Sequence, residues 1–113
     1  MKLAVVGGRD FNSFELLRST LDKIKHKIDM ICSGGATGAD ELAEKYAEEN
    51  KIPIKIFLPQ WDKFGKKAGP LRNKQIVDFS DCCVAFWDGK SRGTLSTINM
   101  CRKSGTPLKI CKY

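Results

Sequence analysis

The chain has 113 residues, 42% of them hydrophobic, which suits one compact domain whose core needs no metal or disulfide. No apolar run approaches the length of about 18 residues needed to cross a bilayer. The apolar start, Leu3–Val6, is too short for a secretory signal. These features argue against a membrane protein or a membrane partner, and we expect a single domain, residues 1–113, in the cytoplasm.

The net charge of +7 is unevenly spread. Residues 1–50 carry 7 Lys and Arg against 9 Asp and Glu, a net of −2, whereas residues 51–113 carry 13 against 4, a net of +9. A basic half is typical of proteins with anionic partners such as nucleotides or nucleic acids. The alternative interpretation is a lysine-rich, solvated surface.

Cysteine and histidine usage does not favour metal chemistry. The five cysteines have no Cys-x-x-Cys spacing, and most stand in or beside apolar runs, as small buried thiols do in a reducing compartment: Cys32, Cys82, Cys83, Cys101 and Cys111. The single histidine, His26, has lysine neighbours. We therefore expect no structural disulfide, no metal site and no cofactor.

Strands and helices alternate along the chain. Apolar runs predict buried strands at 3–6, 28–32, 54–58, 82–87 and 108–111. Helical spacing of apolar residues predicts helices at about 14–27, 39–50, 70–79 and 94–104, with an irregular segment at 59–69. Asn12–Glu15 resembles a capping box for the first helix, and Pro70 is typical of a first helical turn. The pattern predicts an α/β, Rossmann-like three-layer sandwich of about five parallel strands with helices on both faces.

In such a sheet, ligands bind beyond the carboxyl ends of the strands, near the point where the strand order reverses. Four loops should meet at that edge: residues 7–11, 33–40, 59–69 and 88–94. Three of them are rich in glycine, and three carry arginine or lysine. This coincidence predicts a ligand site.

The turn Ser33–Asp40 contains three glycines between a strand and a helix. Glycine permits a close backbone approach, so that N–H groups at the start of the helix can point at a phosphate. The spacing is neither Gly-x-Gly-x-x-Gly nor a P-loop. In the alternative interpretation this is a tight turn in which Thr37 caps the helix and Asp40 completes a capping box.

Two arginines are expected at the same edge. Arg9 follows Gly7–Gly8 and could hold a phosphate with two hydrogen bonds, or form a surface ion pair with Asp10. Arg72 and Asn73 stand at the start of the third helix, where the helix dipole disfavours a positive charge. That placement favours a ligand role for Arg72.

The segment Ser91–Thr94 repeats this pattern. Arg92 supplies charge, Gly93 permits a close approach, and Thr94 is the expected cap of the last helix.

Two tryptophans flank the loops: Trp61 in the irregular segment and Trp87 at the end of a strand. Either could stack on a base. Packing in the core or in a lid is the preferred interpretation for both.

Four motifs occur in order: Gly7–Phe11, Ser33–Asp40, Gly69–Asn73 and Phe86–Thr94. Together they resemble the small stand-alone SLOG proteins of the YspA type across nearly the whole chain. The resemblance implies a Rossmann-like domain that binds nucleotides or nucleotide-derived ligands at these turns.

The Lonely Guy enzymes of the same superfamily cleave nucleoside monophosphates at the N-glycosidic bond. Arg72 and Gly93–Thr94 are similar to parts of their signature, but Thr97 stands where they have a glutamate, and their Pro-Gly-Gly is absent. A hydrolase of this kind would have to use Asp40 or Asp88 as its catalytic carboxylate. This departure weighs against hydrolysis.

Two other branches of the superfamily suggest binding rather than catalysis. Ser33–Asp40 and Arg72–Asn73 are similar to motifs of the DNA-processing protein A family, which implies binding of single-stranded DNA, and the basic half would suit this. SLOG sensor domains of bacterial immunity systems recognise NAD-derived signals.

The leading hypothesis is therefore a protein that binds an adenine- or ADP-ribose-like phosphate ligand, to sense it, sequester it or turn it over slowly. The glycine turn would cradle the phosphate, the three arginines would neutralise it, and Asp40 or Asp88 would hold a ribose hydroxyl or a base edge. The alternatives are a nucleotide N-glycosidase and a binder of single-stranded nucleic acid. Pairing of two copies is expected because related domains often pair. The predicted binding residues are Gly8, Arg9, Ser33, Gly34, Gly35, Thr37, Gly38, Asp40, Arg72, Asn73, Trp87, Asp88, Ser91, Arg92, Gly93 and Thr94.

Overall fold

The computed structural model describes all residues, 1–113. Its centre is a sheet of five parallel strands in the order β3-β2-β1-β4-β5. The strands are β1 (Lys2–Gly7), β2 (Met30–Ser33), β3 (Ile54–Ile56), β4 (Cys82–Trp87) and β5 (Leu108–Lys112). The α/β, Rossmann-like prediction is confirmed, and the chain reverses its direction of travel across the sheet between β1 and β4.

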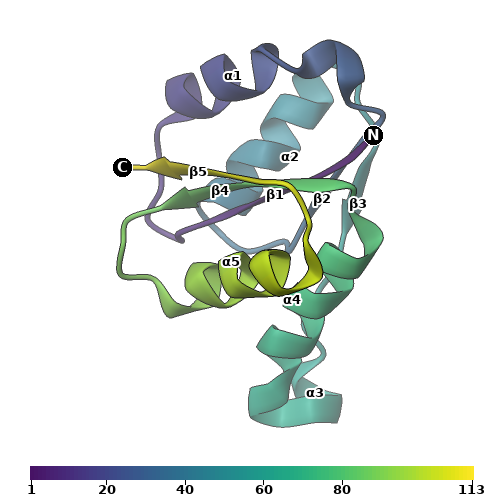
Figure 1. Cartoon of the computed structure of the whole chain (residues 1–113), viewed down its shortest axis with the longest axis vertical. Helices are drawn as coiled ribbons and strands as arrows, with labels where there is room; N and C mark the ends of the chain where they lie inside the picture. Colours follow the sequence, from purple (N-terminus) through teal and green to yellow (C-terminus); the bar gives the residue numbers. More distant parts are fainter.

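Helices cover both faces of this sheet (Figure 1). They are α1 (Phe14–Asp22) and α2 (Ala39–Glu49) on one face, α4 (Ala68–Phe79) and α5 (Arg92–Ser104) on the other, and the short α3 (Trp61–Phe64), which projects away from the sheet. Because side chains alternate along a strand, Leu3 and Val5 of β1 pack with α1 and α2, while Ala4 and Val6 pack with α4 and α5.

The first helix starts at Phe14 as predicted, but its cap and its end differ from the prediction. Ser13 rather than Asn12 is the cap, and its Oγ accepts a hydrogen bond from the Leu16 N–H at 3.3 Å. The helix ends at Asp22 and gives way to a 3-10 turn at Lys25–Lys27. The backbone bonds there span three residues instead of four, which tightens the chain ahead of β2.

The segment predicted to be irregular contains helical structure. It holds α3, a 3-10 turn at Gly65–Lys67 and the beginning of α4, which starts at Ala68, two residues before Pro70. Proline is tolerated there because the N–H groups of the first helical turn have no partner within the helix.

None of the helices has both the length and the apolar character that a membrane crossing requires. All five cysteines are free, with Cys32, Cys83 and Cys101 buried. No group of three or more His, Cys, Asp or Glu side chains is placed to hold a metal ion.

Candidate functional site

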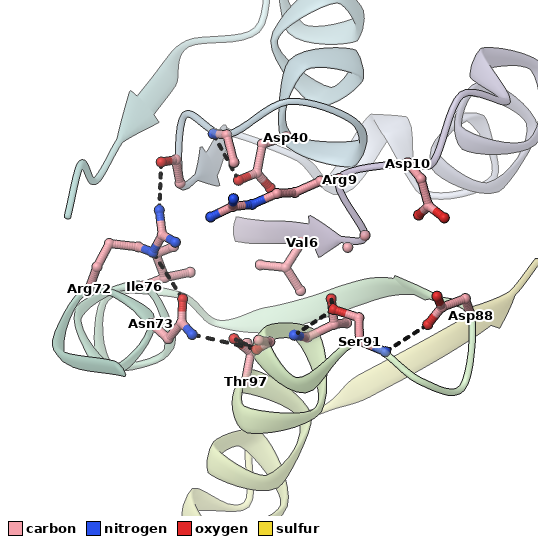
Figure 2. A pocket seen from close by; sticks show the side chains of 16 residues that line it. Val6, Arg9, Asp10, Asp40, Arg72, Asn73, Ile76, Asp88, Ser91 and Thr97 are labelled. Atoms are coloured by element: carbon pink, nitrogen blue, oxygen red, sulfur yellow. Dashed lines mark hydrogen bonds between the residues drawn. The ribbon is translucent and has the colours of Figure 1, made fainter. Parts of the chain in front are cut away.

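A hollow of about 450 Å³ opens at the carboxyl ends of β1 and β4, where the strand order reverses. Figure 2 shows the side chains of its wall, which come from the loop after β1, the turn before α2, and the first turns of α4 and α5. We call it the main hollow. Many of the predicted binding residues line it: Gly8, Arg9, Gly34, Asp40, Arg72, Asn73, Asp88, Ser91, Gly93 and Thr94.

The turn before α2 is organised by Asp40, which is only 6% exposed. Its Oδ2 accepts a hydrogen bond from the Ala36 N–H at 3.2 Å. Burial raises the pKa of this carboxyl group, and the Ala36 N–H and the Arg72 charge oppose the rise. Asp40 therefore supplies its own negative charge to the start of α2, and takes one backbone donor of the turn that was predicted to cradle a phosphate.

The Asp40→Asn variant is expected to change the pH dependence of stability. Because folding raises the pKa of Asp40 above its ordinary value of 3.8, the folded protein binds this proton more tightly than the unfolded chain. The contribution of Asp40 to the free energy of unfolding therefore falls as the pH rises past that value. Asparagine keeps an oxygen for Ala36 but does not titrate.

Urea unfolding of both proteins at about pH 4 and about pH 7 measures this effect. The free energy of unfolding of the Asp40→Asn variant minus that of the unmodified protein should be larger at about pH 7 than at about pH 4. An equal difference at both values would contradict the prediction.

Arg72 ties α4 to the two neighbouring loops. Its Nη1 donates to the carbonyl oxygen of Gly34 at 2.6 Å and, more weakly, to that of Phe57 at 3.4 Å, while Nε donates to Asn73 Oδ1 at 2.9 Å. A Cβ on Gly34 would collide with the guanidinium group and lie 2.9 Å from Asp40 Oδ2, so a side chain at this position would displace Arg72. The Nη2 of Arg72 has no partner in the chain and remains available.

Arg9 is exposed and extends across the main hollow, with its guanidinium group directed toward Arg72 (Figure 2). Burial lowers the pKa of Arg72, the charge of Asp40 opposes this shift, and the nearby charge of Arg9 adds to it. The ion pair of Arg9 with Asp10 considered above is not formed, because Asp10 accepts a hydrogen bond from the Tyr113 hydroxyl at 2.6 Å. The three ion pairs of the chain include neither arginine, so two guanidinium groups converge, with the charge of the buried Asp40 offsetting part of that of Arg72.

The loop before α5 is held by side chains that accept backbone hydrogen bonds. Asp88 Oδ1 accepts from the N–H groups of Lys90 and Ser91, each at 2.8 Å, and these bonds lower the pKa of Asp88. The cap of α5 is Ser91 rather than the predicted Thr94: its Oγ accepts from the Thr94 N–H at 3.4 Å. The first turn of α5 is thereby fixed in the wall of the main hollow.

Thr97 lies in the same wall, where the resemblance to Lonely Guy enzymes would place a glutamate. Its hydroxyl donates to the carbonyl oxygen of Gly93 at 3.4 Å. This position therefore offers no carboxylate for catalysis.

A second hollow, also of about 450 Å³, adjoins the first. The two share Arg9, Gly34, Ala36 and Arg72, and the second adds Gly35, Thr37, Leu58, Pro59 and Trp61. Gly35 and Thr37, predicted to cradle the same phosphate as Gly34, thus face this neighbouring space. Thr37 does not cap α2, because the cap position is occupied by Gly38 without a side-chain bond.

Ser33 and Gly38 lie outside both hollows. Ser33 is fully buried at the end of β2, and its Oγ has no hydrogen-bond partner. Gly38 packs against the loop after β1, where a Cβ would collide with the carbonyl oxygen of Gly8. Both residues therefore support the conformation of the turn but do not face either hollow.

Trp87 and Arg92 also lie outside the two hollows. The Nε1 of Trp87 donates to the carbonyl oxygen of Ser91 at 3.1 Å, and its ring packs against the core beneath α4 and α5. Arg92 is exposed at the first residue of α5. Of the three arginines predicted to neutralise a phosphate, two therefore line the main hollow.

Sequence reasoning missed several residues of the main hollow: Val6, Gly7, Asp10, Ala36, Ile76 and Thr97. Helical spacing could have identified two of them, because Ile76 lies four residues after Arg72 and Thr97 lies three residues after Thr94. Of the other four, Gly7, Asp10 and Ala36 are next to residues that had been predicted to bind the ligand, and Val6 is next to Gly7.

The parallel sheet and the hollow at its reversal point define a Rossmann-like α/β protein. Residues 1–64 match the family described as YspA, cpYpsA-related SLOG, and the chain belongs to this family. It is 35% identical over 85 residues to the Gene 61 protein of Mycobacterium phage D29, an alignment that covers 70% of this chain and 68% of that protein.

Two solved structures share the fold. DNA processing protein A from Helicobacter pylori, described with its single-stranded DNA binding mode, has a TM-score of 0.74 and 21% identity, over 97% of this chain and 64% of that one. DNA processing protein A from Streptococcus pneumoniae has a TM-score of 0.78 and 20% identity, over 96% and 49%. The chain thus spans roughly half to two thirds of these structural relatives.

Proposed function

We propose that the protein binds a nucleotide or a nucleotide-derived, ADP-ribose-like ligand, with a phosphate group between Arg9 and Arg72. The observation that carries this proposal is the pair of converging guanidinium groups, neither of which forms an ion pair; the buried Asp40 offsets part of the Arg72 charge, and Arg9 has no such partner. Two like charges held close together raise the free energy of the empty site, and a bound anion lowers it. Guanidinium groups also match phosphate oxygens geometrically, which makes arginine the preferred partner for this anion.

The remaining polar groups of the main hollow suit a sugar. Asp10 and Asp88 line the wall together with the hydroxyl groups of Ser91 and Thr94. Carboxylates repel a phosphate but accept hydrogen bonds from ribose hydroxyl groups. A phosphate at the arginines and the terminal ribose of an ADP-ribose-like ligand toward the aspartates would satisfy both kinds of group.

Single-stranded nucleic acid is the second candidate ligand. Both similar solved structures are DNA processing protein A, and one is described with its mode of binding single-stranded DNA. Residues 51–113 carry the net charge of +9 that a polyanion would favour. A phosphodiester would use the same arginine pair.

A thermal-shift panel tests both candidates, with AMP, ADP-ribose, NAD and a short oligothymidylate at fixed ionic strength. A ligand at about 100 times its dissociation constant adds about 2.7 kcal/mol to the free energy of unfolding, which raises the midpoint measurably. We expect a shift with at least one adenine nucleotide. If the oligothymidylate binds, the logarithm of its binding constant should fall with the logarithm of the salt concentration, with a slope of about −0.7 per neutralised phosphate. No shift with any of the four would contradict the proposal.

A further inference from the structure

We propose that the second hollow binds the nucleobase of the ligand, with Trp61 as its stacking surface. This inference rests on the proposed function, because it places the base of the same ligand whose phosphate lies between the arginines. The proposed function uses the glycine turn and the arginine pair but not the second hollow. The inference assigns a role to that hollow.

The first observation is the exposure of two large apolar side chains in the wall. Trp61 is 52% exposed and Leu58 is 64% exposed, so neither of these large apolar side chains is buried in the core. Of the two packing interpretations preferred for Trp61 from the sequence, the core is therefore excluded, whereas packing in a lid is not. Apolar side chains of this size that remain open to water, gathered in one concave wall, are typical of a ligand surface.

The second observation is that the indole of Trp61 is supported from behind. A Cβ on Gly69 would lie 3.5 Å from Cη2 of Trp61, so the ring packs against α4 at a position that has no side chain. Arg72 follows in the next turn of the same helix. The aromatic ring thus rests on the same helix that carries Arg72.

The third observation is continuity between the two hollows. Arg9 and Arg72 line both of them, so a phosphate at the arginines lies at their boundary. The main hollow offers aspartates and hydroxyl groups, whereas the second offers Trp61, Leu58 and Pro59. Only the second has the flat, apolar surface that a base requires.

The side chains of this wall include few hydrogen-bonding groups. Apart from the two arginines, Thr37 alone has a polar side chain that does not belong to an aromatic ring. Stacking on an aromatic ring tolerates every base because each has a π face. The subsite should therefore accept adenine and thymine alike, either on a free nucleotide or in a single strand.

Fluorescence of Trp61 tests the assignment directly. The chain has two tryptophans, so the Trp87→Phe variant leaves Trp61 as the only one. Ribose 5-phosphate carries a hydroxyl group at the position where AMP carries adenine, and the two are otherwise alike. We expect AMP to quench the emission of Trp61 and ribose 5-phosphate to leave it unchanged at concentrations where it competes with AMP.

Calorimetric titration of the Trp61→Ala variant gives a measurement that needs no tryptophan signal. Its affinity for AMP should fall by about ten-fold or more, as expected for a lost stacking contact, while its affinity for ribose 5-phosphate stays unchanged. Phe64→Ala is the matched control, because Phe64 is a 40% exposed aromatic residue of the same short helix but lies outside the wall. It should leave both affinities unchanged.

The outcomes separate this inference from the proposed function. If AMP binds through Arg9 but neither quenches Trp61 nor responds to Trp61→Ala, the base lies elsewhere and only the inference is overturned. Equal quenching by ribose 5-phosphate would also overturn it. Quenching by oligothymidylate but not by AMP would support the subsite and identify a strand as the source of the base. If no probe binds, the proposed function fails and the subsite fails with it.

Discussion

Replacing Arg9 with methionine should weaken AMP binding by about 10- to 100-fold without lowering the stability of the ligand-free protein. A hydrogen bond to a charged group contributes about 1.5–3 kcal/mol, which sets this range. Arg9 makes no hydrogen bond or ion pair within the chain, so its removal breaks no internal contact. It also relieves the repulsion that Arg9 exerts on Arg72. Affinity should therefore fall while the unfolding midpoint stays constant or rises.

Arg92→Met is the matched control, because it removes the same charge from an exposed position outside both hollows. Calorimetric titration at fixed ionic strength measures the affinities, and thermal unfolding without ligand measures the stabilities. Equal losses of affinity in the two variants would mean that only the overall positive charge attracts the ligand. A marked fall in stability of the Arg9→Met variant would show that Arg9 supports the fold.

Gly38→Ala should lower the free energy of unfolding by about 3 kcal/mol or more. Gly38 has φ 76° and ψ −127°, a conformation that is essentially restricted to glycine. A Cβ would also collide with the carbonyl oxygen of Gly8, a backbone atom in the loop that presents Arg9. Backbone strain of about 1–2 kcal/mol and overpacking of about 1–3 kcal/mol act together at this position.

Gly105→Ala separates these two effects. Gly105 has φ 75° and ψ 16° at the end of α5, a left-handed conformation, and no atom lies within 4 Å of the position of its Cβ. Its replacement should lower the free energy of unfolding by only about 1 kcal/mol, because strain acts there without collision. Urea unfolding of both variants measures the difference. Equal losses would mean that the loop after β1 moves aside without cost.

The fold and the sheet edge at which the main hollow opens could be predicted from the sequence, because both follow from periodicity. Continuous apolar runs identified β1 and β4, and parallel strands must end at one edge, which brings Arg9 and Ser91 together. The placement of Arg92 could not be predicted in the same way. One residue along a helix turns a side chain by about 100°, so the start of α5 had to be known to a single residue.

The hydrogen bond of Asp40 and the exposure of Trp61 lay beyond sequence reasoning for a different reason. A capping box and a bond to the Ala36 N–H use the same residue type at the same distance from the turn, and only the path of the loop distinguishes them. Trp61 begins a helix of four residues, which is too short for any periodicity to show which side of it faces a cavity.

The two outer strands of the sheet bear on how copies of this protein can meet. β3 has only three residues, with Lys55 exposed at its centre, and β5 carries exposed lysines at Lys109 and Lys112. Short outer strands and lysine side chains discourage a second sheet from adding to the row of unpaired backbone groups. Growth of the sheet from one molecule into the next is thus disfavoured on both sides, which protects the protein against ordered aggregation. If two copies pair, a helical face is the better contact.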